Sequence, residues 1–175
     1  MFKVKKIRTG EICQVLGTYC DEYGKAWFLF WVGDKWCWRP AADYVPPNYV
    51  SQIKLIVAGS RDFNNYQLLS KELDQYKGRL KEVVSGMAKG ADTLGRNWAI
   101  TNDIKVAEFP ADWTLGNSAG FIRNHQMGDY ADELLAFWNG TSSGTQDMID
   151  YMISLSKPVT VIKYTSDNYF ERLTY

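Results

Sequence analysis

Small polar residues and glycines gather in four short segments of this sequence, each directly after a run of apolar residues. The segments are residues 59–62, 85–92, 109–113 and 139–145. Backbone N–H groups bind phosphate at close range, so the side chains around a phosphate must be small. A helix that starts just after such a turn adds free N–H donors and the positive end of its dipole. The pattern therefore predicts a site for a phosphate-bearing ligand.

The last of these segments fits a phosphate best. Gly140 and Gly144 lead into a predicted helix, and Ser143 and Thr145 add hydroxyl donors beside them. The glycines of residues 85–92 suit a second phosphate cradle, or a wall on which a sugar lies flat against the backbone.

Charged residues in the same segments can bind the rest of a nucleotide. Arg61 and Arg123 can pair with phosphate oxygens in bidentate fashion. Asp92 and Asp112 can accept hydrogen bonds from ribose hydroxyls or from a base amine. The residues expected to contact the ligand are Gly59, Ser60, Arg61, Ser85, Gly86, Gly90, Asp92, Asp112, Trp113, Arg123, Asn124, Gly140, Thr141, Ser142, Ser143, Gly144 and Thr145.

Each feature also has a purely structural interpretation. Glycines at strand ends often serve only the turn, and Arg61 with Asp62 could form a surface ion pair worth under about 1 kcal/mol. Trp113 could belong to the core. The ligand-binding interpretation is favoured because the predicted topology brings all four segments to one edge of one sheet.

The elements that must position these segments alternate between strands and helices from residue 53 onward. Continuous apolar runs predict buried parallel strands, and apolar residues at helical spacing predict helices between them. The expected strands cover residues 53–59, 81–86, 104–110, 131–140 and 157–164, and the expected helices cover residues 63–80, 91–100, 119–130 and 144–155. This order predicts a Rossmann-like α/β domain, a parallel sheet flanked by helices with right-handed crossovers. The polar and aromatic tail, residues 165–175, is expected to pack back onto the protein.

The first fifty residues have a different character. β-Branched and aromatic runs alternate with turn signals at Asp21–Gly24 and Gly33–Asp34, which predicts strands joined by hairpins. The composition changes at Pro46–Pro47–Asn48. We therefore expect a small all-β segment over residues 1–50, a barrel or curled sheet that could be SH3-like, and the α/β domain over residues 51–175.

Composition limits the function. The 175 residues carry 20 basic and 20 acidic side chains, so the formal net charge is zero. A sequence-independent nucleic-acid binder normally has a basic surplus, so a nucleic acid is not expected as a partner. No run is apolar enough for a signal peptide or a membrane span, so no membrane partner is expected. The three cysteines have no metal-ligand spacing, and neither a metal nor another cofactor is expected.

Five motifs resemble the SLOG superfamily in order and spacing. They are GSRDF, SGMAKGAD, FPADW, AGFIRNHQM and NGTSSGT, and together they cover residues 53–163 approximately. This superfamily includes the Lonely Guy phosphoribohydrolases, DprA-like DNA-processing proteins and nucleotide-sensing domains of antiviral systems. The resemblance is to a branch of small bacterial and phage proteins, and it implies a Rossmannoid nucleotide-binding domain.

The chain departs from the enzymes of this superfamily at the acid/base position. Lonely Guy enzymes carry a catalytic glutamate in a PGGxGTxxE loop, and Met148 stands at the corresponding position here. Asp147 is one residue early, which turns it about 100° away on a helix. Their catalytic arginine begins an R-K-x-x-M stretch that matches Arg123 and Met127, with Asn124 in place of the lysine. The phosphate-holding parts therefore resemble the family, while the catalytic part does not.

Three functions follow, and the first is preferred. It is a sensor or sequestering protein, not an enzyme, for a nucleotide-derived molecule such as an ADP-ribose relative or a cyclic nucleotide; in a phage it would blunt host immunity. The second is an N-glycoside hydrolase acting on nucleoside 5′-monophosphates through Arg123 and an aspartate such as Asp147. The third is a single-stranded DNA binder of the DprA kind. From the superfamily we also expect a homo-oligomer, and we expect the protein in the cytoplasm, that of the host if a phage encodes it.

Overall fold

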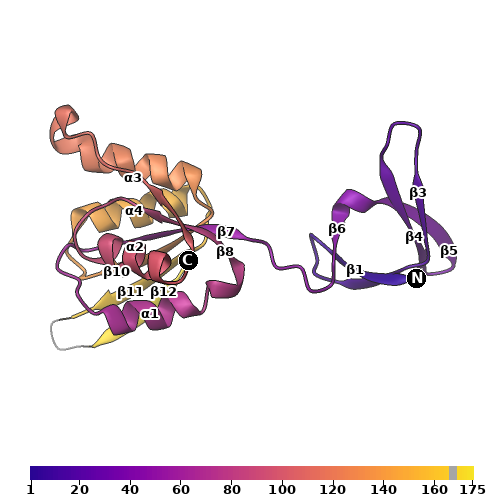
Figure 1. Ribbon diagram of the computed structural model, residues 1–175, viewed down its shortest axis with the longest axis horizontal. Coiled ribbons are helices and arrows are strands. Elements are labelled where there is room, and N and C mark those ends of the chain that lie inside the picture. Colours follow the sequence, from indigo (N-terminus) through magenta and orange to yellow (C-terminus); the bar gives the residue numbers. More distant parts are fainter. Residues whose placement is uncertain (166–168) are drawn as a thin grey trace. The chain divides into compact units, whose positions relative to one another are not determined.

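The computed structural model describes residues 1–165 and 169–175. The chain divides into two compact units, Met1–Ser51 and Gln52–Tyr175. Figure 1 shows only strands and one short helical turn in the first unit, and strands alternating with helices in the second.

The first unit consists of two three-stranded antiparallel sheets, with strand orders β2-β1-β6 and β3-β4-β5. Its buried apolar core is small, formed by Val4, Val15 and Phe30, against which Phe28 and Tyr44 pack. Its strands are β1 (Phe2–Lys6), β2 (Ile12–Val15), β3 (Gly17–Cys20), β4 (Ala26–Val32), β5 (Lys35–Pro40) and β6 (Tyr44–Val45).

The other face of the β3-β4-β5 sheet carries exposed aromatic rings. Side chains alternate between the faces of a strand, so residues opposite the Phe28 and Phe30 side point to solvent. Trp31 packs edge-on against Trp36 with ring centroids 4.8 Å apart, and both rings are exposed. Many of the aromatic side chains of these strands therefore lie at the surface, and only some of them contribute to the core.

The second unit is built on one six-stranded sheet with strand order β12-β11-β10-β7-β8-β9. All neighbouring strands are parallel except the edge strand β12, which is antiparallel to β11. The chain moves outward from β7 to β9 on one side, then crosses to β10 on the other. The strands are β7 (Ile53–Gly59), β8 (Leu80–Ser85), β9 (Lys105–Glu108), β10 (Glu133–Trp138), β11 (Val159–Tyr164) and β12 (Phe170–Thr174).

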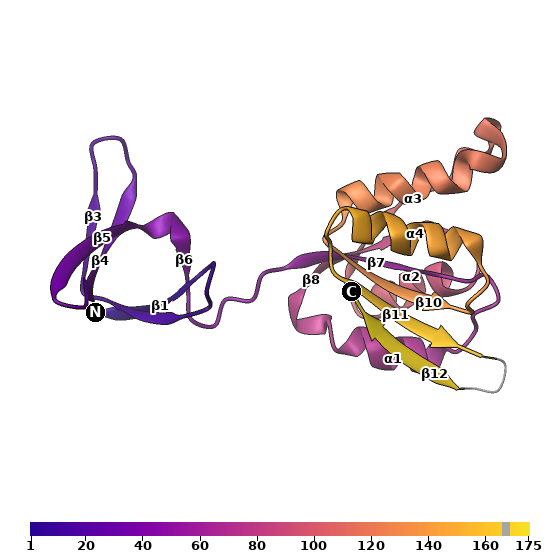
Figure 2. The same cartoon turned by 180° about the vertical axis from the view of Figure 1, so that it is seen from behind.

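Helices cover both faces of this sheet, as Figure 2 shows for α3 and α4 above it and α1 below. Leu55, Val57 and Leu135 point into the core under α1 and α2, whereas Ile56 and Ala136 point into the core under α3 and α4. The helices are α1 (Tyr66–Asp74), α2 (Ala91–Thr101), α3 (Ala119–Tyr130) and α4 (Ser143–Ser154). The observed fold confirms the predicted α/β class with a Rossmann-like parallel sheet and a small β-rich amino-terminal segment.

Two elements differ from the sequence prediction. The helix expected over residues 63–80 starts only at Tyr66, because the side chain of Asn65 accepts the N–H of Leu68 and caps it there. It ends at Asp74 and is followed by a short 3-10 turn, Lys77–Arg79. In the tail, Phe170–Thr174 forms a strand, β12, which completes the sheet edge beside β11, and residues 166–168 lie outside the described residues.

Candidate functional site

A cleft lies where the direction of chain progression reverses, between the ends of β7 and β10. In open α/β sheets this crevice outside the carboxyl ends of the strands is where ligands bind. The cleft has a volume of about 590 Å³. Of the residues expected to contact a ligand, those that line it are Gly59, Ser60, Arg61, Asp92, Trp113, Arg123, Asn124, Thr141, Ser142, Ser143, Gly144 and Thr145.

The loop before α4 leaves the first N–H groups of this helix free. The Oδ1 atom of Asn139 accepts the N–H of Ser142 at 2.9 Å. Ser142 is the N-cap of α4, and its Oγ accepts the N–H of Thr145 at 3.4 Å. The N–H groups of Ser143 and Gly144 make no hydrogen bond with any described residue, and both residues line the cleft. They lie at the positive end of the helix dipole, which is the arrangement that binds anions.

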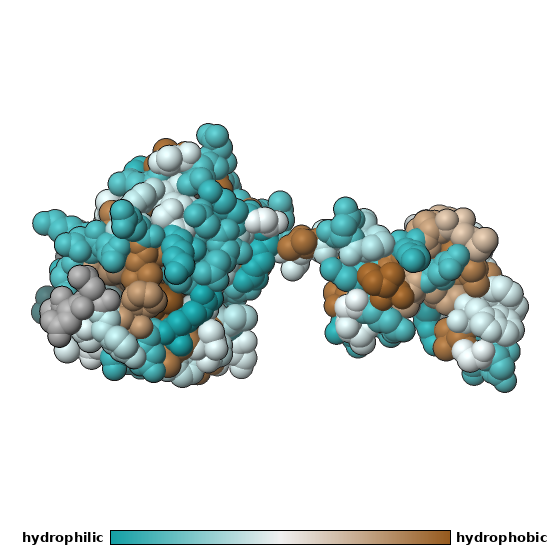
Figure 3. All heavy atoms as spheres, turned by 90° about the horizontal axis from the view of Figure 1, so that it is seen from below, coloured by the Kyte–Doolittle hydropathy of each residue, from teal (hydrophilic) through white to brown (hydrophobic). Residues whose placement is uncertain are grey.

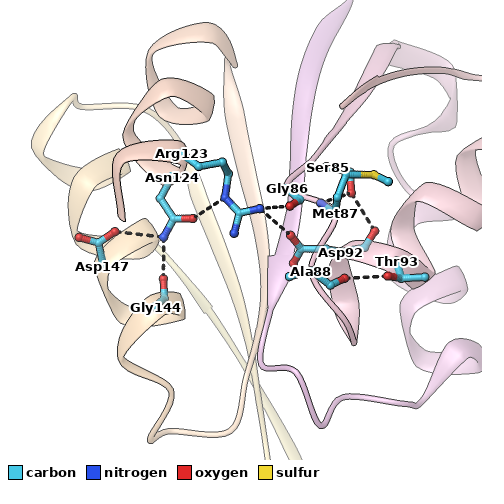
Figure 4. Close-up of polar contacts among 10 residues, drawn as sticks. All are labelled: Ser85, Gly86, Met87, Ala88, Asp92, Thr93, Arg123, Asn124, Gly144 and Asp147. Carbon is cyan, nitrogen blue, oxygen red and sulfur yellow. Dashed lines mark hydrogen bonds and ion pairs between the residues drawn. The ribbon is translucent and has the colours of Figure 1, made fainter. Parts of the chain in front are cut away.

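Arg123 crosses from α3 to the end of β8, as Figure 4 shows. Its Nη1 donates to the carbonyl oxygen of Gly86 and lies 3.9 Å from the Oδ2 of Asp92, while its Nε donates to Asn124 at 3.2 Å. Its Nη2 makes no hydrogen bond with a described residue. Two of the three guanidinium nitrogens are therefore held by the protein, and the third is available to a ligand in the cleft.

Asp92 and Arg123 change each other's pKa in a site that is largely shielded from solvent. Burial raises the pKa of Asp92 to about 6, and the positive charge of Arg123 opposes this rise. Burial also lowers the pKa of Arg123, an effect that Asp92 opposes and the nearby Arg61 reinforces. Because the two cations raise the positive potential of the cleft wall, this end of the site favours an anionic group.

Asn124 connects α3 to the start of α4. Its Nδ2 donates to the carbonyl oxygen of Gly144 at 2.9 Å and to the Oδ2 of Asp147 at 3.0 Å, and its side chain is buried. Asp147 also lies 3.3 Å from the Nε2 of His125 and does not line the cleft. Met148 does line it and is otherwise packed in the core. The carboxylate next to the expected catalytic position is thus engaged by α3, and the cleft floor there is apolar.

Five residues expected at the site support it without lining it. Ser85 is buried and donates to the backbone carbonyl of Asp92 at 3.1 Å. The side chain of Asp112 caps the following turn by accepting the N–H of Thr114. Gly90, with φ +83°, precedes α2, and an added Cβ there would collide with the Ser60 carbonyl. The other two are Gly86, which accepts from Arg123, and Gly140, whose φ of +81° forms the turn after β10.

The cleft also includes residues that were not among the expected ligand contacts. Asp62 and Asn139 both line it, and the Nδ2 of Asn139 donates to Asp62 at 3.1 Å. The Asn-Gly pair after β10 was a turn signal, which could have indicated the role of Asn139 in the loop. The remaining additions are Ala58, Ala88, Asn117, Gly120, Phe121 and Met148.

The parallel sheet and the glycine-rich cleft at its switch point define an α/β domain of the nucleotide-binding type. Residues 53–116 match the family model described as "YspA, cpYpsA-related SLOG family". The match confirms the SLOG resemblance over this segment. No curated protein matches the chain.

Two solved structures are similar in fold, and both are DNA processing proteins. DNA processing protein A (DprA) from Streptococcus pneumoniae has 17% sequence identity and a TM-score of 0.57, over 66% of this chain and 52% of that chain. DNA processing protein A from Helicobacter pylori, whose single-stranded DNA binding mode is described, has 16% identity and a TM-score of 0.48, over 67% of this chain and 68% of that chain. The chain thus corresponds to about half the length of the pneumococcal protein.

One expectation is wrong on this finding, namely that a nucleic acid is not a partner of this chain. A fold similar to that of this chain occurs in a DNA processing protein, so the zero net charge does not by itself exclude a nucleic acid. Net charge averages over the whole surface, whereas a strand contacts only a local group of cations and rings. Among the described residues, no helix is long and apolar enough to span a membrane, and no cluster of three metal-ligating side chains occurs.

Proposed function

We propose that the unit of residues 52–175 binds a nucleotide-derived small molecule, with a phosphate at the start of α4. The observation that carries this proposal is the pair of N–H groups at Ser143 and Gly144, which make no hydrogen bond with a described residue. Both residues line the cleft, as do Arg61 and Arg123. Backbone donors, a helix dipole and two guanidinium groups together form an anion site. The exposed ring of Trp113 on the cleft wall is suited to stack on a base.

The proposed role is to hold the ligand, as a sensor or a sequestering protein, and not to cleave it. Cleavage of an N-glycosidic bond proceeds through an oxocarbenium-like state and needs a carboxylate beside the anomeric carbon. Asp147 is hydrogen-bonded to Asn124 outside the cleft, and Met148 occupies the adjoining floor. Candidate ligands are ADP-ribose relatives and cyclic nucleotides.

Calorimetric titration of the full chain with nucleoside mono- and diphosphates, ADP-ribose and cyclic nucleotides tests this proposal, with chromatography of each mixture afterwards. We expect a ligand that is recovered intact and binds about tenfold or more weakly to Arg61→Ala, since a charged hydrogen bond contributes about 1.5–3 kcal/mol. Arg8→Ala, an exposed arginine of the first unit, is the matched control. Recovery of free base and sugar phosphate would replace the proposal with a hydrolase.

The second candidate is a single-stranded nucleic acid in the same cleft. It is favoured by two exposed rings, Trp113 and Phe121, which line the cleft near its cations, and by the fold that the chain shares with a DNA processing protein. Bases stack on such rings while phosphates pair with the arginines. This candidate predicts that oligonucleotide binding weakens steeply with added salt and with Trp113→Ala. Binding of a free nucleotide that is tighter than that of any oligonucleotide would argue against it.

A further inference from the structure

A second cavity lies next to the cleft, and the hydrogen-bonded pair of Asp62 and Asn139 forms the boundary between them. Both residues line both cavities, and the second cavity has a volume of about 270 Å³. Pockets that hold a complete small-molecule ligand usually measure about 300–1,000 Å³. The second cavity is therefore small for a ligand of its own, but it has room for one ring that continues from the cleft.

The chemistry of the second cavity differs from that of the cleft. Among the described residues that line it, none is basic, and the only charged one is Asp62. Its apolar part is formed by the buried side chains of Phe63 and Leu68, and its polar part includes the exposed side chain of Asn64. On this side of the unit, near α1 and β12, Figure 3 shows hydrophobic residues between hydrophilic borders. Such a lining repels a phosphate and accepts an uncharged ring with hydroxyl or amide groups.

Asp62 is held at the boundary as a hydrogen-bond acceptor. Its Oδ1 accepts from the Nδ2 of Asn139 at 3.1 Å and from the hydroxyl of Tyr164 at 3.0 Å. Its Oδ2 makes no hydrogen bond with any described residue. Tyr164 is fixed in turn by edge-on packing against Phe63, with ring centroids 5.1 Å apart. Burial and the neighbouring Asp62 carboxylate raise the pKa of Tyr164 to about 12, which keeps the hydroxyl a donor. A fixed carboxylate with one free oxygen is suited to accept from the hydroxyls of a sugar.

We propose that the ligand has two ends: a phosphate group in the cleft, and a second, uncharged ring linked through that phosphate, which lies in the second cavity against Asp62. The inference rests on the proposed function, because it assigns the phosphate to the start of α4. If the ligand is a nucleoside diphosphate sugar, the second ring is its sugar; if the ligand is a short strand, the second ring belongs to the next nucleoside. Both sources share a phosphate-linked ring with hydroxyl or amide groups.

Calorimetric titration of the full chain with matched pairs of ligands tests the proposal. The pairs are ADP with ADP-ribose, UDP with UDP-glucose and GDP with GDP-mannose, and a 5′-phosphorylated dinucleotide is compared with its mononucleotide. We expect the two-ended member of at least one pair to bind tenfold or more tightly than its partner. Asn64→Ala and Tyr164→Phe should remove most of this advantage and leave the affinity for the one-ended member within twofold. Asn48→Ala, in the first unit, is the matched control.

The outcomes distinguish failure of the two-ended ligand from failure of the proposed phosphate site. An advantage for a nucleotide sugar assigns the second cavity to a sugar, and an advantage for the dinucleotide assigns it to a nucleoside of a strand. Equal affinity within every pair, with no effect of either variant, overturns the two-ended ligand while the proposed phosphate site stands. Absence of binding by every member of every pair overturns the proposed function and this inference with it. Thermal denaturation of each variant shows whether lost affinity comes from an unfolded protein.

Discussion

Gly86 is the residue against which the guanidinium of Arg123 lies. A Cβ at this position would collide with that guanidinium and approach the Oδ2 of Asp92 to 2.8 Å. We expect Gly86→Ala to lower the free energy of unfolding by about 1–3 kcal/mol, because the partly buried guanidinium of Arg123 must move. Urea denaturation followed by tryptophan fluorescence measures this change. Gly78→Ala is the control, since a Cβ at Gly78 meets nothing within 4 Å; an equal loss in both variants would contradict the explanation.

Asp92 makes the stability depend on pH. Its pKa is about 6 in the folded protein against an ordinary value of 3.8, because burial disfavours the carboxylate. Below pH 4 both states hold the proton; between about pH 4 and 6 the unfolded chain releases it while the folded chain keeps it. The free energy of unfolding therefore falls as the pH rises through this window, by about 3 kcal/mol for a shift of about two pKa units. Above pH 6 this contribution is constant.

The comparison with Asp92→Asn isolates this effect. The free energy of unfolding of the original protein minus that of the variant should decrease from pH 4 to 6 and stay level above pH 6, as measured by urea denaturation at each pH. Asp112→Asn is the control, because hydrogen bonds from Thr114 hold the pKa of that carboxyl below its usual value. Its difference should change in the opposite direction and at lower pH. A level difference for Asp92→Asn across the whole range would show that Asp92 titrates normally.

At the scale of elements, the first turn of α4 both begins the helix and lines the cleft in which we expect the phosphate. Gly144 lines the cleft at the second position of the helix, and an added Cβ meets nothing within 4 Å. We expect Gly144→Leu to keep the free energy of unfolding within about 1 kcal/mol of the original value, because leucine is the better helix former. The same side chain should lower the affinity for a phosphate ligand tenfold or more. Denaturation and calorimetry together check this, and unchanged affinity would place the phosphate elsewhere.

The sequence predicted the strands of the second unit well because they are buried on both faces. Ile53–Gly59 reads as an apolar run ending in glycine, and that is the observed range of β7. The helix predicted over residues 63–80 is longer than the observed α1. Local hydrogen bonds, such as the Asn65 cap, set where α1 begins and where it ends after Asp74. β12 was missed as a strand because it is a mostly exposed edge, so its residues show no apolar pattern.

The candidate site was predictable to the level of loops but not of individual side chains. Strand ends and small residues located residues 59–61 and 141–145, and all of them line the cleft. Sequence alone did not show that Asp112 would cap the turn after it by accepting the N–H of Thr114. It also did not show that Asp62, after β7, would contact Asn139, which follows β10 much farther along the chain. Such contacts depend on side-chain rotamers and on the parallel pairing of β7 with β10, which periodicity does not encode.

At the scale of the whole molecule, the cleft and both cores that support it belong to residues 52–175. Every buried residue of the two larger clusters lies in this unit, and the small cluster around Val4 and Phe30 belongs to the other. Residues 47–52, which include the boundary between the units, form no helix or strand. Folding of the second unit should therefore not depend on the first, because each buries its apolar side chains separately.

We expect a fragment of residues 52–175 to fold with the helix and strand content of its part of the full chain and to bind the same phosphate ligand within twofold. Circular dichroism, urea denaturation and calorimetry measure these properties. The fragment of residues 1–51 should be much less stable, because a unit of this size with so small a buried core is marginal. A large loss of affinity in the fragment of residues 52–175, with its fold intact, would show that the exposed aromatic side of the β3-β4-β5 sheet or another part of the first unit takes part in binding. Substitution of Trp31 and Trp36 by serine in the full chain would then lower the affinity if the aromatic side of this sheet takes part, and would leave it unchanged if another part of the first unit does.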